Sequence, residues 1–174
     1  MKRELDIEQL MTDYGEEIKR LVYTYVKDHA ATEDVTQEIF LTVYLKMDSF
    51  KGDSSVKTWI YSIAVNKCKD YLRSWHVRKL SIQENIMDLL KSSRHSPDEE
   101  TVIKMENAQL VEEVLRLPVK YREVVLLYYY RDLAVREISE ILQLGESAVK
   151  LRLHRGRQKL RKILEQSERS EANG

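Results

Sequence analysis

The sequence predicts an all-α protein of two small helical domains joined by a flexible linker, with a helix-turn-helix in the second domain. Three observations support this fold class. The 174 residues suffice for one ordinary domain or two small ones. Only five Gly and two Pro occur in a chain that is 33% charged. Apolar residues recur at helical spacing on both sides of residues 81–105, where that periodicity weakens, and no strand-like alternation is present.

The first domain is expected over residues 1–80. Helical periodicity predicts three helices there, in chain order: about 8–28, then 33–46 with Thr32 as its N-cap, then a long helix that begins at Ser54 or Ser55 and reaches about Trp75. The stretch "DSFKGDSS" between the second and third helices is a loop by composition.

A linker is expected over residues 81–105, because "KSSRHSPDEE" is polar and contains a proline. One short helix is predicted within it, at 86–91. The second domain is expected over 106–166, with helices predicted, in order, at 104–117, at 119–132 after Pro118, at 134–142 and finally at 148–164. The remaining residues, 167–174, are expected to be a disordered tail.

The segment "AVREISEILQLGESAVKLRLHRGR" has the form of a helix-turn-helix. A short apolar-faced helix is followed by a tight turn at Gln143–Gly145 and then by a second helix. In such a motif the second helix lies in the major groove of DNA. Two packed helices with no role in DNA binding are the alternative.

The second helix of this motif is strongly basic, although the whole chain has a formal net charge of +0. At 100° per residue it shows one apolar stripe suited to a core, formed by Val149, Leu153, Gly156, Leu160, Ile163 and Leu164. The opposite face carries Lys150, Leu151, His154, Arg155 and Gln158, and the stripe is flanked by Arg152, Arg157 and Lys159.

A solvated surface helix is the plain alternative for this segment. Unmixed positive charge repels itself along a helix, however, and Leu151 lies among polar residues where a solvated face needs no apolar group. Leucine beside lysine, histidine and arginine suits the edges of bases, where a methyl group meets thymine and arginine binds guanine. The pattern therefore favours DNA reading.

A second polar face is predicted on the long helix of the first domain. Ser62, Asn66, Lys69 and Arg73 form one narrow ribbon, bordered by Trp59. Small polar and basic groups beside an aromatic ring suit unstacked bases. The alternative is an ordinary polar face with Trp59 in the core.

A third face lies on the helix predicted at 33–46. Acidic and amide groups share it with two leucines, which a solvated face would not need. Its members are Asp34, Gln37, Glu38, Leu41 and Leu45. The mixture indicates a protein-docking surface.

Several function classes lack support in the sequence. The single cysteine, Cys68, excludes an intramolecular disulfide and a cysteine-pair metal site. The four histidines are scattered, and no catalytic, metal-binding or cofactor-binding motif is present. The longest apolar run, "VVLLYYY", is too short to span a bilayer, and the charged N-terminus has no signal-peptide region. We therefore expect a cytoplasmic protein that is not an enzyme and needs no metal or cofactor.

Four stretches together resemble a bacterial RNA polymerase sigma factor of the extracytoplasmic-function group. They are "ATEDVTQEIFLTVY", "FKGDSSVKTWIYSIAVNKCKDYLR", "LPVKYREVVLLYYYRDLAVREISEIL" and "SAVKLRLHRGRQKLRKIL". Their order and spacing cover nearly everything outside the linker. The resemblance implies sigma region 2 over 1–80 and sigma region 4 over 106–166.

The resemblance also implies roles for individual residues. Docking on the clamp helices of the polymerase largest subunit falls to Asp34, Gln37, Glu38 and Leu41. Holding the bases of the melted −10 element falls to Phe50, Lys51, Asp53, Ser54, Trp59, Ser62, Asn66, Lys69 and Arg73. Reading the −35 element falls to Lys150, Leu151, His154 and Arg155, with Arg152, Arg157 and Lys159 also on that DNA.

The partners implied are core RNA polymerase, including the flap of its second-largest subunit, promoter DNA, and an anti-sigma factor in a stress or envelope response. No small-molecule substrate and no membrane insertion are expected, although an anti-sigma factor could hold the chain at a membrane. A self-sufficient DNA-binding repressor is the rival function, but it leaves the first eighty residues without a role.

Two positions depart from the family pattern. Glycine usually stands where this chain has Gln143, and serine or another capping residue usually stands where it has Gly145. Glutamine would cost up to about 1 kcal/mol if the turn keeps a positive φ there.

Overall fold

The computed structural model describes residues 5–82 and 108–173, and within these ranges every regular element is helical. The chain divides into two compact units, Met1–Lys104 and Met105–Gly174. The predicted all-α fold is thus confirmed for the described ranges, neither of which holds a helix long and apolar enough to cross a membrane. The short helix predicted at 86–91 and nearly all of the predicted linker lie outside them.

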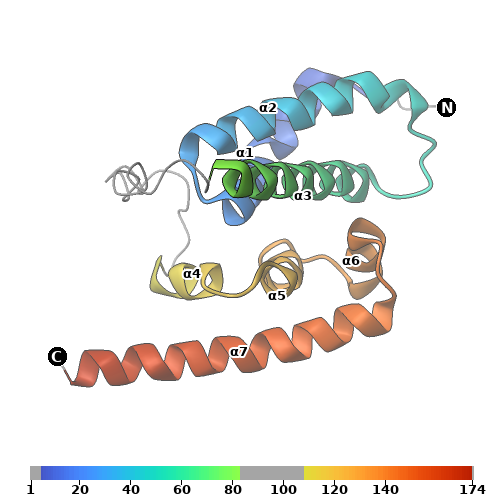
Figure 1. Cartoon of the computed structure of the whole chain (residues 1–174). Coiled ribbons are helices and arrows are strands. Elements are labelled where there is room, and N and C mark those ends of the chain that lie inside the picture. The colour runs from blue at the N-terminus through green and yellow to red at the C-terminus, as the bar shows by residue number, and fades with distance from the viewer. Residues whose placement is uncertain (1–4, 83–107, 174) are drawn as a thin grey trace. The chain divides into compact units, whose positions relative to one another are not determined.

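The first unit contains α1 (Ile7–Val26), α2 (His29–Lys46), the short 3₁₀ turn η1 (Met47–Ser49) and α3 (Val56–Ile82) (Figure 1). Each of the three long helices packs against the other two. All three contribute fully buried side chains to the core, namely Ile18, Leu21, Val22, Ile39, Val43, Ile60, Ala64 and Val65. The hydroxyl of buried Tyr61 on α3 donates to the Glu17 carboxylate of α1 over 2.7 Å.

Aspartate and serine side chains cap the N-termini of these helices. Asp6 caps α1 and Asp28 caps α2, each accepting a backbone N–H of the first turn. Ser55 Oγ accepts the Thr58 N–H at 3.0 Å, as predicted for the start of α3. The predicted N-cap at Thr32 is wrong: α2 begins four residues earlier than predicted, and the buried Thr32 hydroxyl donates to the Asp28 carbonyl at 2.6 Å.

The second unit contains α4 (Ala108–Leu115), α5 (Val119–Val125), the π-helical turn η2 (Leu126–Tyr130), α6 (Val135–Leu142) and α7 (Glu146–Ala172). Figure 1 shows α4, α5 and α6 along one side of α7, which is one long helix. The side chains that are almost fully buried there include Leu117, Val124, Leu127, Ile138, Ile141 and Val149. The helix predicted at 119–132 is therefore present, with a wider turn in its second half.

Both long helices extend beyond their predicted ends. α3 continues to Ile82, two residues into the expected linker. Residues 167–172, expected to be disordered, belong to α7. Contacts with α4 account for this extension, because the Ser167 hydroxyl donates to Glu113 at 2.5 Å and Arg116 donates to the same carboxylate at 2.8 Å. Glu113 is buried, so these bonds replace most of the contacts with water that its carboxylate loses.

The packing of α5 on α7 requires a glycine. An added Cβ at Gly156 would lie 3.0 Å from Val125 Cγ2 and 3.5 Å from both the Cβ and the carbonyl oxygen of Tyr121. Val125 is buried and β-branched, so it has little freedom to move aside. The predicted apolar stripe of α7 therefore contains a glycine because two helix backbones approach closely there.

Replacement of Gly156 by leucine should lower the free energy of unfolding by about 1–3 kcal/mol, because the larger side chain overfills this contact. This cost should exceed the gain from the higher helix propensity of leucine. The measurement is urea denaturation followed by circular dichroism at 222 nm. Gly15→Ala on α1 is the control, since nothing lies within 4 Å of the added Cβ and alanine should stabilise the helix by about 0.5–1 kcal/mol. Equal stabilisation by both substitutions would show that the α5–α7 contact is not tight.

Candidate nucleic-acid interface and docking surface

The turn between α6 and α7 has helix-turn-helix geometry. α6 ends at Leu142, and Gln143 adopts the left-handed conformation with φ 53° and ψ 46°. The Leu144 N–H donates to the Ser139 carbonyl at 3.1 Å, while the Ser139 hydroxyl donates back to the Leu144 carbonyl at 2.5 Å. Gly145 then caps α7 without a side-chain hydrogen bond. The three-residue turn lies where it was predicted, and the structure adds what the sequence left open, a positive φ at a residue that is not glycine.

The face of α7 opposite its buried stripe is open to solvent. Val149 and Leu153 are buried, whereas the four residues predicted to read bases are exposed: Lys150, Leu151, His154 and Arg155. Leu151 is 48% exposed, in contrast to the buried Val149 and Leu153 of the stripe. We call these four residues the reading face. Their role on DNA remains a prediction. Contact with DNA requires side chains that are open to solvent, as these four are.

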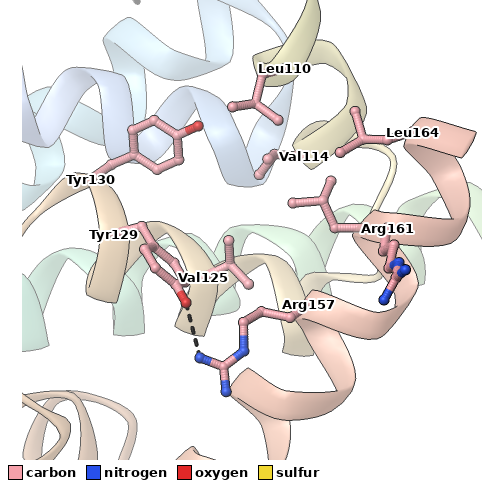
Figure 2. Close-up of a pocket in the computed structure, with 9 residues that line it drawn as sticks. Leu110, Val114, Val125, Tyr129, Tyr130, Arg157, Arg161 and Leu164 are labelled. Carbon is pink, nitrogen blue, oxygen red and sulfur yellow. Dashed lines mark hydrogen bonds between the residues drawn. The ribbon is translucent and has the colours of Figure 1, made fainter. Parts of the chain in front are cut away.

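The three cations that flank the stripe have partners within the second unit. Arg152 Nη1 lies 3.1 Å from Glu123 Oε1 of α5, whose side chain is only 2% exposed. Arg157 Nη1 donates to the hydroxyl of Tyr129 at 2.9 Å (Figure 2). The Lys159 ammonium lies 5.6 Å from the centre of the Tyr121 ring, within the range of a cation–π contact. These side chains therefore fasten α7 to α5 and η2, a function that the sequence did not reveal.

A pocket of about 280 Å³ opens beside these contacts, between α4, α5, η2 and α7 (Figure 2). Apolar side chains dominate its lining, with Tyr129, Arg157 and Arg161 among its polar groups. Tyr128 and Tyr129 are exposed on η2, and burial raises the pKa of half-buried Tyr130. The sequence did not predict this pocket, because the run "VVLLYYY" was considered only as a possible membrane span, which it is too short to form.

Some side chains of the polar ribbon on α3 are occupied by contacts within the same helix. Asn66 is exposed, and Lys69 is half-buried. Arg73 forms an ion pair with Asp70 on the same helix, and the Ser62 hydroxyl donates to the Thr58 carbonyl at 2.9 Å. Asn66 is therefore the ribbon residue best placed to meet a ligand.

The loop that precedes α3 is held by an aromatic contact. The rings of Phe50 and half-buried Trp59 lie 4.8 Å apart, so Trp59 is neither fully exposed nor part of the core. Gly52 has a φ of 79°, which allows the chain to turn. Lys51 and Asp53 are exposed and Ser54 is half-buried, so the loop offers polar groups beside an aromatic pair.

The predicted docking surface on α2 is exposed and more apolar than expected. Asp34, Gln37 and Glu38 are exposed, and Glu38 lies 3.9 Å from the Lys67 ammonium. Three large apolar or aromatic residues follow along the helix: Leu41 is 58% exposed, Tyr44 56% and Leu45 71%. Tyr44 was missed by sequence analysis, because its position borders the buried face on a helical wheel. Large apolar residues that gather on one exposed face are typical of protein-interaction surfaces, so the docking role predicted for this face remains a prediction.

The described residues give no indication of metal or thiol chemistry. Within 5–82 and 108–173, no group of three or more His, Cys, Asp or Glu is placed to hold a metal ion. Cys68 is buried, and desolvation raises the pKa of its thiol, which is therefore protonated and unreactive at neutral pH.

Comparison with protein families gives two matches. Residues 10–77 match the family described as Sigma-70 region 2, and residues 107–160 match Sigma-70, region 4. One relative, "ECF RNA polymerase sigma factor SigW" of Bacillus subtilis (strain 168), is 34% identical over 158 residues, covering 87% of this chain and 84% of the relative. "ECF RNA polymerase sigma factor SigM" of the same strain is 30% identical over 160 residues, with 91% and 95% covered.

Two solved structures share the fold. The sigma factor RpoE of Bartonella quintana, in complex with the anti-sigma factor NepR, superimposes with a TM-score of 0.70 at 18% identity, covering 91% of this chain and 96% of RpoE. CnrH, in complex with the cytosolic domain of CnrY, gives a TM-score of 0.64 at 21% identity, with 91% and 87% covered.

The left-handed residue in the turn supplies a test of this geometry. Gln143→Gly should raise the free energy of unfolding by about 0.5–1 kcal/mol, because glycine adopts a positive φ without a Cβ penalty. Gln158→Gly, the same replacement at an exposed position inside α7, should instead lower it by about 1 kcal/mol. Thermal denaturation of both variants gives the comparison, and destabilisation by Gln143→Gly would contradict the left-handed turn.

Proposed function

Because the chain belongs to the extracytoplasmic-function group of RNA polymerase sigma factors, we propose that its three exposed faces divide the work of promoter recognition. As a sigma factor it binds core RNA polymerase and directs promoter-specific initiation of transcription. The observation that carries the proposal is the arrangement of α7: four reading-face residues are exposed, while the flanking cations bind α5 and η2.

The reading face is proposed to recognise the −35 element in duplex DNA. A helix of this kind enters the major groove with its first turns against base edges. Lys150, His154 and Arg155 supply hydrogen-bond donors, and Leu151 supplies an apolar contact suited to the methyl group of thymine. Arg157 and Lys159, at the edges of the buried stripe, are proposed to reach only phosphates, which position a protein without specifying sequence.

The loop before α3 and the polar ribbon are proposed to hold the melted −10 element. Single-stranded bases bind by stacking on aromatic rings and through a few polar contacts. The Phe50–Trp59 pair supplies the rings, and Lys51, Asp53, Ser54 and Asn66 supply polar groups nearby. Ser62, Lys69 and Arg73 extend the same face along α3 and are assigned to the DNA backbone.

The surface on α2 is proposed to dock on the clamp helices of the polymerase largest subunit. The residues assigned to docking are Asp34, Gln37, Glu38 and Leu41, and exposed Tyr44 and Leu45 enlarge the apolar part that begins at Leu41. An apolar centre with charged neighbours is the usual composition of a protein interface. The apolar pocket of the second unit is a second proposed contact, for the flap of the second-largest subunit.

Regulation by an anti-sigma factor is also proposed, within a stress or envelope response. Support comes from the structural relative RpoE, which was solved in complex with an anti-sigma factor. We place the chain in the cytoplasm, with its polymerase, where a membrane-bound anti-sigma factor could hold it. The polymerase supplies the catalytic groups, so the chain itself is proposed not to be an enzyme.

The proposed roles of the α2 surface and the α3 ribbon can be distinguished in one experiment. Asp34→Lys combined with Glu38→Lys should reduce co-purification with core polymerase at least about tenfold, because charge reversal inside an interface costs more than the 1.4 kcal/mol that this factor represents. Asn66→Ala should leave core binding intact and reduce promoter opening, measured by permanganate footprinting of the −10 bases.

The control for the double variant is Asp13→Lys combined with Glu16→Lys, which reverses two exposed acids on α1 instead. Circular dichroism establishes that all variants remain helical. Undiminished core binding by the α2 variant, or normal melting by Asn66→Ala, would remove the corresponding surface from the proposal. Tight promoter binding by the wild-type chain without polymerase would favour a repressor instead.

A further inference from the structure

One cation of the basic helix is paired with a buried acid. Arg152 Nη1 lies 3.1 Å from Glu123 Oε1, and the exposed fractions of the two side chains are 29% and 2%. Glu123 lies in the middle of α5, the helix that packs most extensively on α7. The pair therefore crosses the helix contact on which the orientation of the reading face depends.

The guanidinium of Arg152 is committed to this contact. Arg152 gives the deeply buried carboxylate of Glu123 a charge-assisted hydrogen bond, so moving Arg152 toward a phosphate would take that bond from an acid that water does not replace. Arg155, one turn further along α7, is exposed and carries no such commitment. The two arginines, although only three residues apart, therefore differ in what they can do on DNA.

The pair also lies on one flank of the buried stripe, opposite the Arg157–Tyr129 hydrogen bond on the other flank. A helix held on both flanks cannot roll about its axis. Rolling would carry Leu151 and Arg155 away from the base edges they are proposed to meet.

We propose that Arg152 and Glu123 are positioning residues, which set the rotation of α7 and thereby the −35 sequence that the reading face prefers. This inference rests on the proposed reading of the −35 element by α7. It reassigns Arg152 from a DNA contact to an internal one, and it gives a role in promoter choice to Glu123, a residue whose buried side chain DNA cannot reach.

The test uses holoenzyme, assembled from core polymerase and the full chain, on a promoter library randomised at the −35 element. Discrimination is the transcript yield from the promoters preferred by the wild type, divided by the library median. Three variants are compared: Glu123→Met, Arg152→Met, and the double variant. Lys162→Met, an exposed position with no assigned role, controls for the loss of one positive charge.

Glu123→Met should lower discrimination at least about fivefold, the loss expected when one bidentate base contact is misplaced. The double variant should recover most of it, because a well-packed apolar pair can replace a buried ion pair. Its salt dependence should match that of the wild type, since no phosphate contact has been removed. A merely structural role would instead lower transcription from every promoter in parallel and leave discrimination unchanged.

Direct DNA contact by Arg152 gives the opposite pattern, and would overturn the proposal. Glu123→Met would then keep full discrimination, while Arg152→Met and the double variant would lose it equally and flatten the salt dependence. If Arg152→Met fails to fold, Glu123→Met and the double variant still decide between these outcomes. Absence of any −35 preference in wild-type holoenzyme would refute the proposed reading function itself, a result distinct from both patterns.

Discussion

The contact between α5 and α7 decides which residues of the basic helix are available to DNA. Gly156 lets the two backbones approach, and Val149 and Leu153 are buried on the same stripe. Once that stripe is covered, the helical repeat alone leaves Lys150, Leu151, His154 and Arg155 on the opposite side.

The same contact explains how a chain with no formal net charge can hold a polyanion. Between Lys150 and Lys159 the basic residues of α7 form two groups, those tied to α5 and η2 and those of the reading face. The first group neutralises a buried acid and packs on aromatic rings, so it contributes to the fold. The second group keeps its charge in solvent, where it can act on DNA locally whatever the total charge of the chain. Arg157 and Lys159 of the first group are also exposed, which leaves their charges within reach of phosphates.

Much of this arrangement is predictable from the sequence, because the spacing of apolar residues along an amphipathic helix predicts which face is buried. The stripe of α7, the turn at Gln143–Gly145 and the N-cap at Ser55 all follow from local patterns. Contacts between distant residues do not. The sequence does not distinguish Arg152 from its cationic neighbours, because its partner Glu123 lies on α5, 29 residues away in the chain. The polar end of α7 was likewise expected to be disordered, because the buried acid that binds Ser167 lies on α4.

The most direct test of the reading face compares two cations of α7 on a library of −35 variants, transcribed at two salt concentrations. Arg155→Ala should cost about 1–3 kcal/mol on the preferred promoter and relax the preference at one base pair. Lys159→Ala should weaken all promoters about equally and reduce the slope of log affinity against log salt by about 0.9. If both substitutions lower every promoter in parallel, α7 acts only as an electrostatic clamp, and the account of its reading face is wrong.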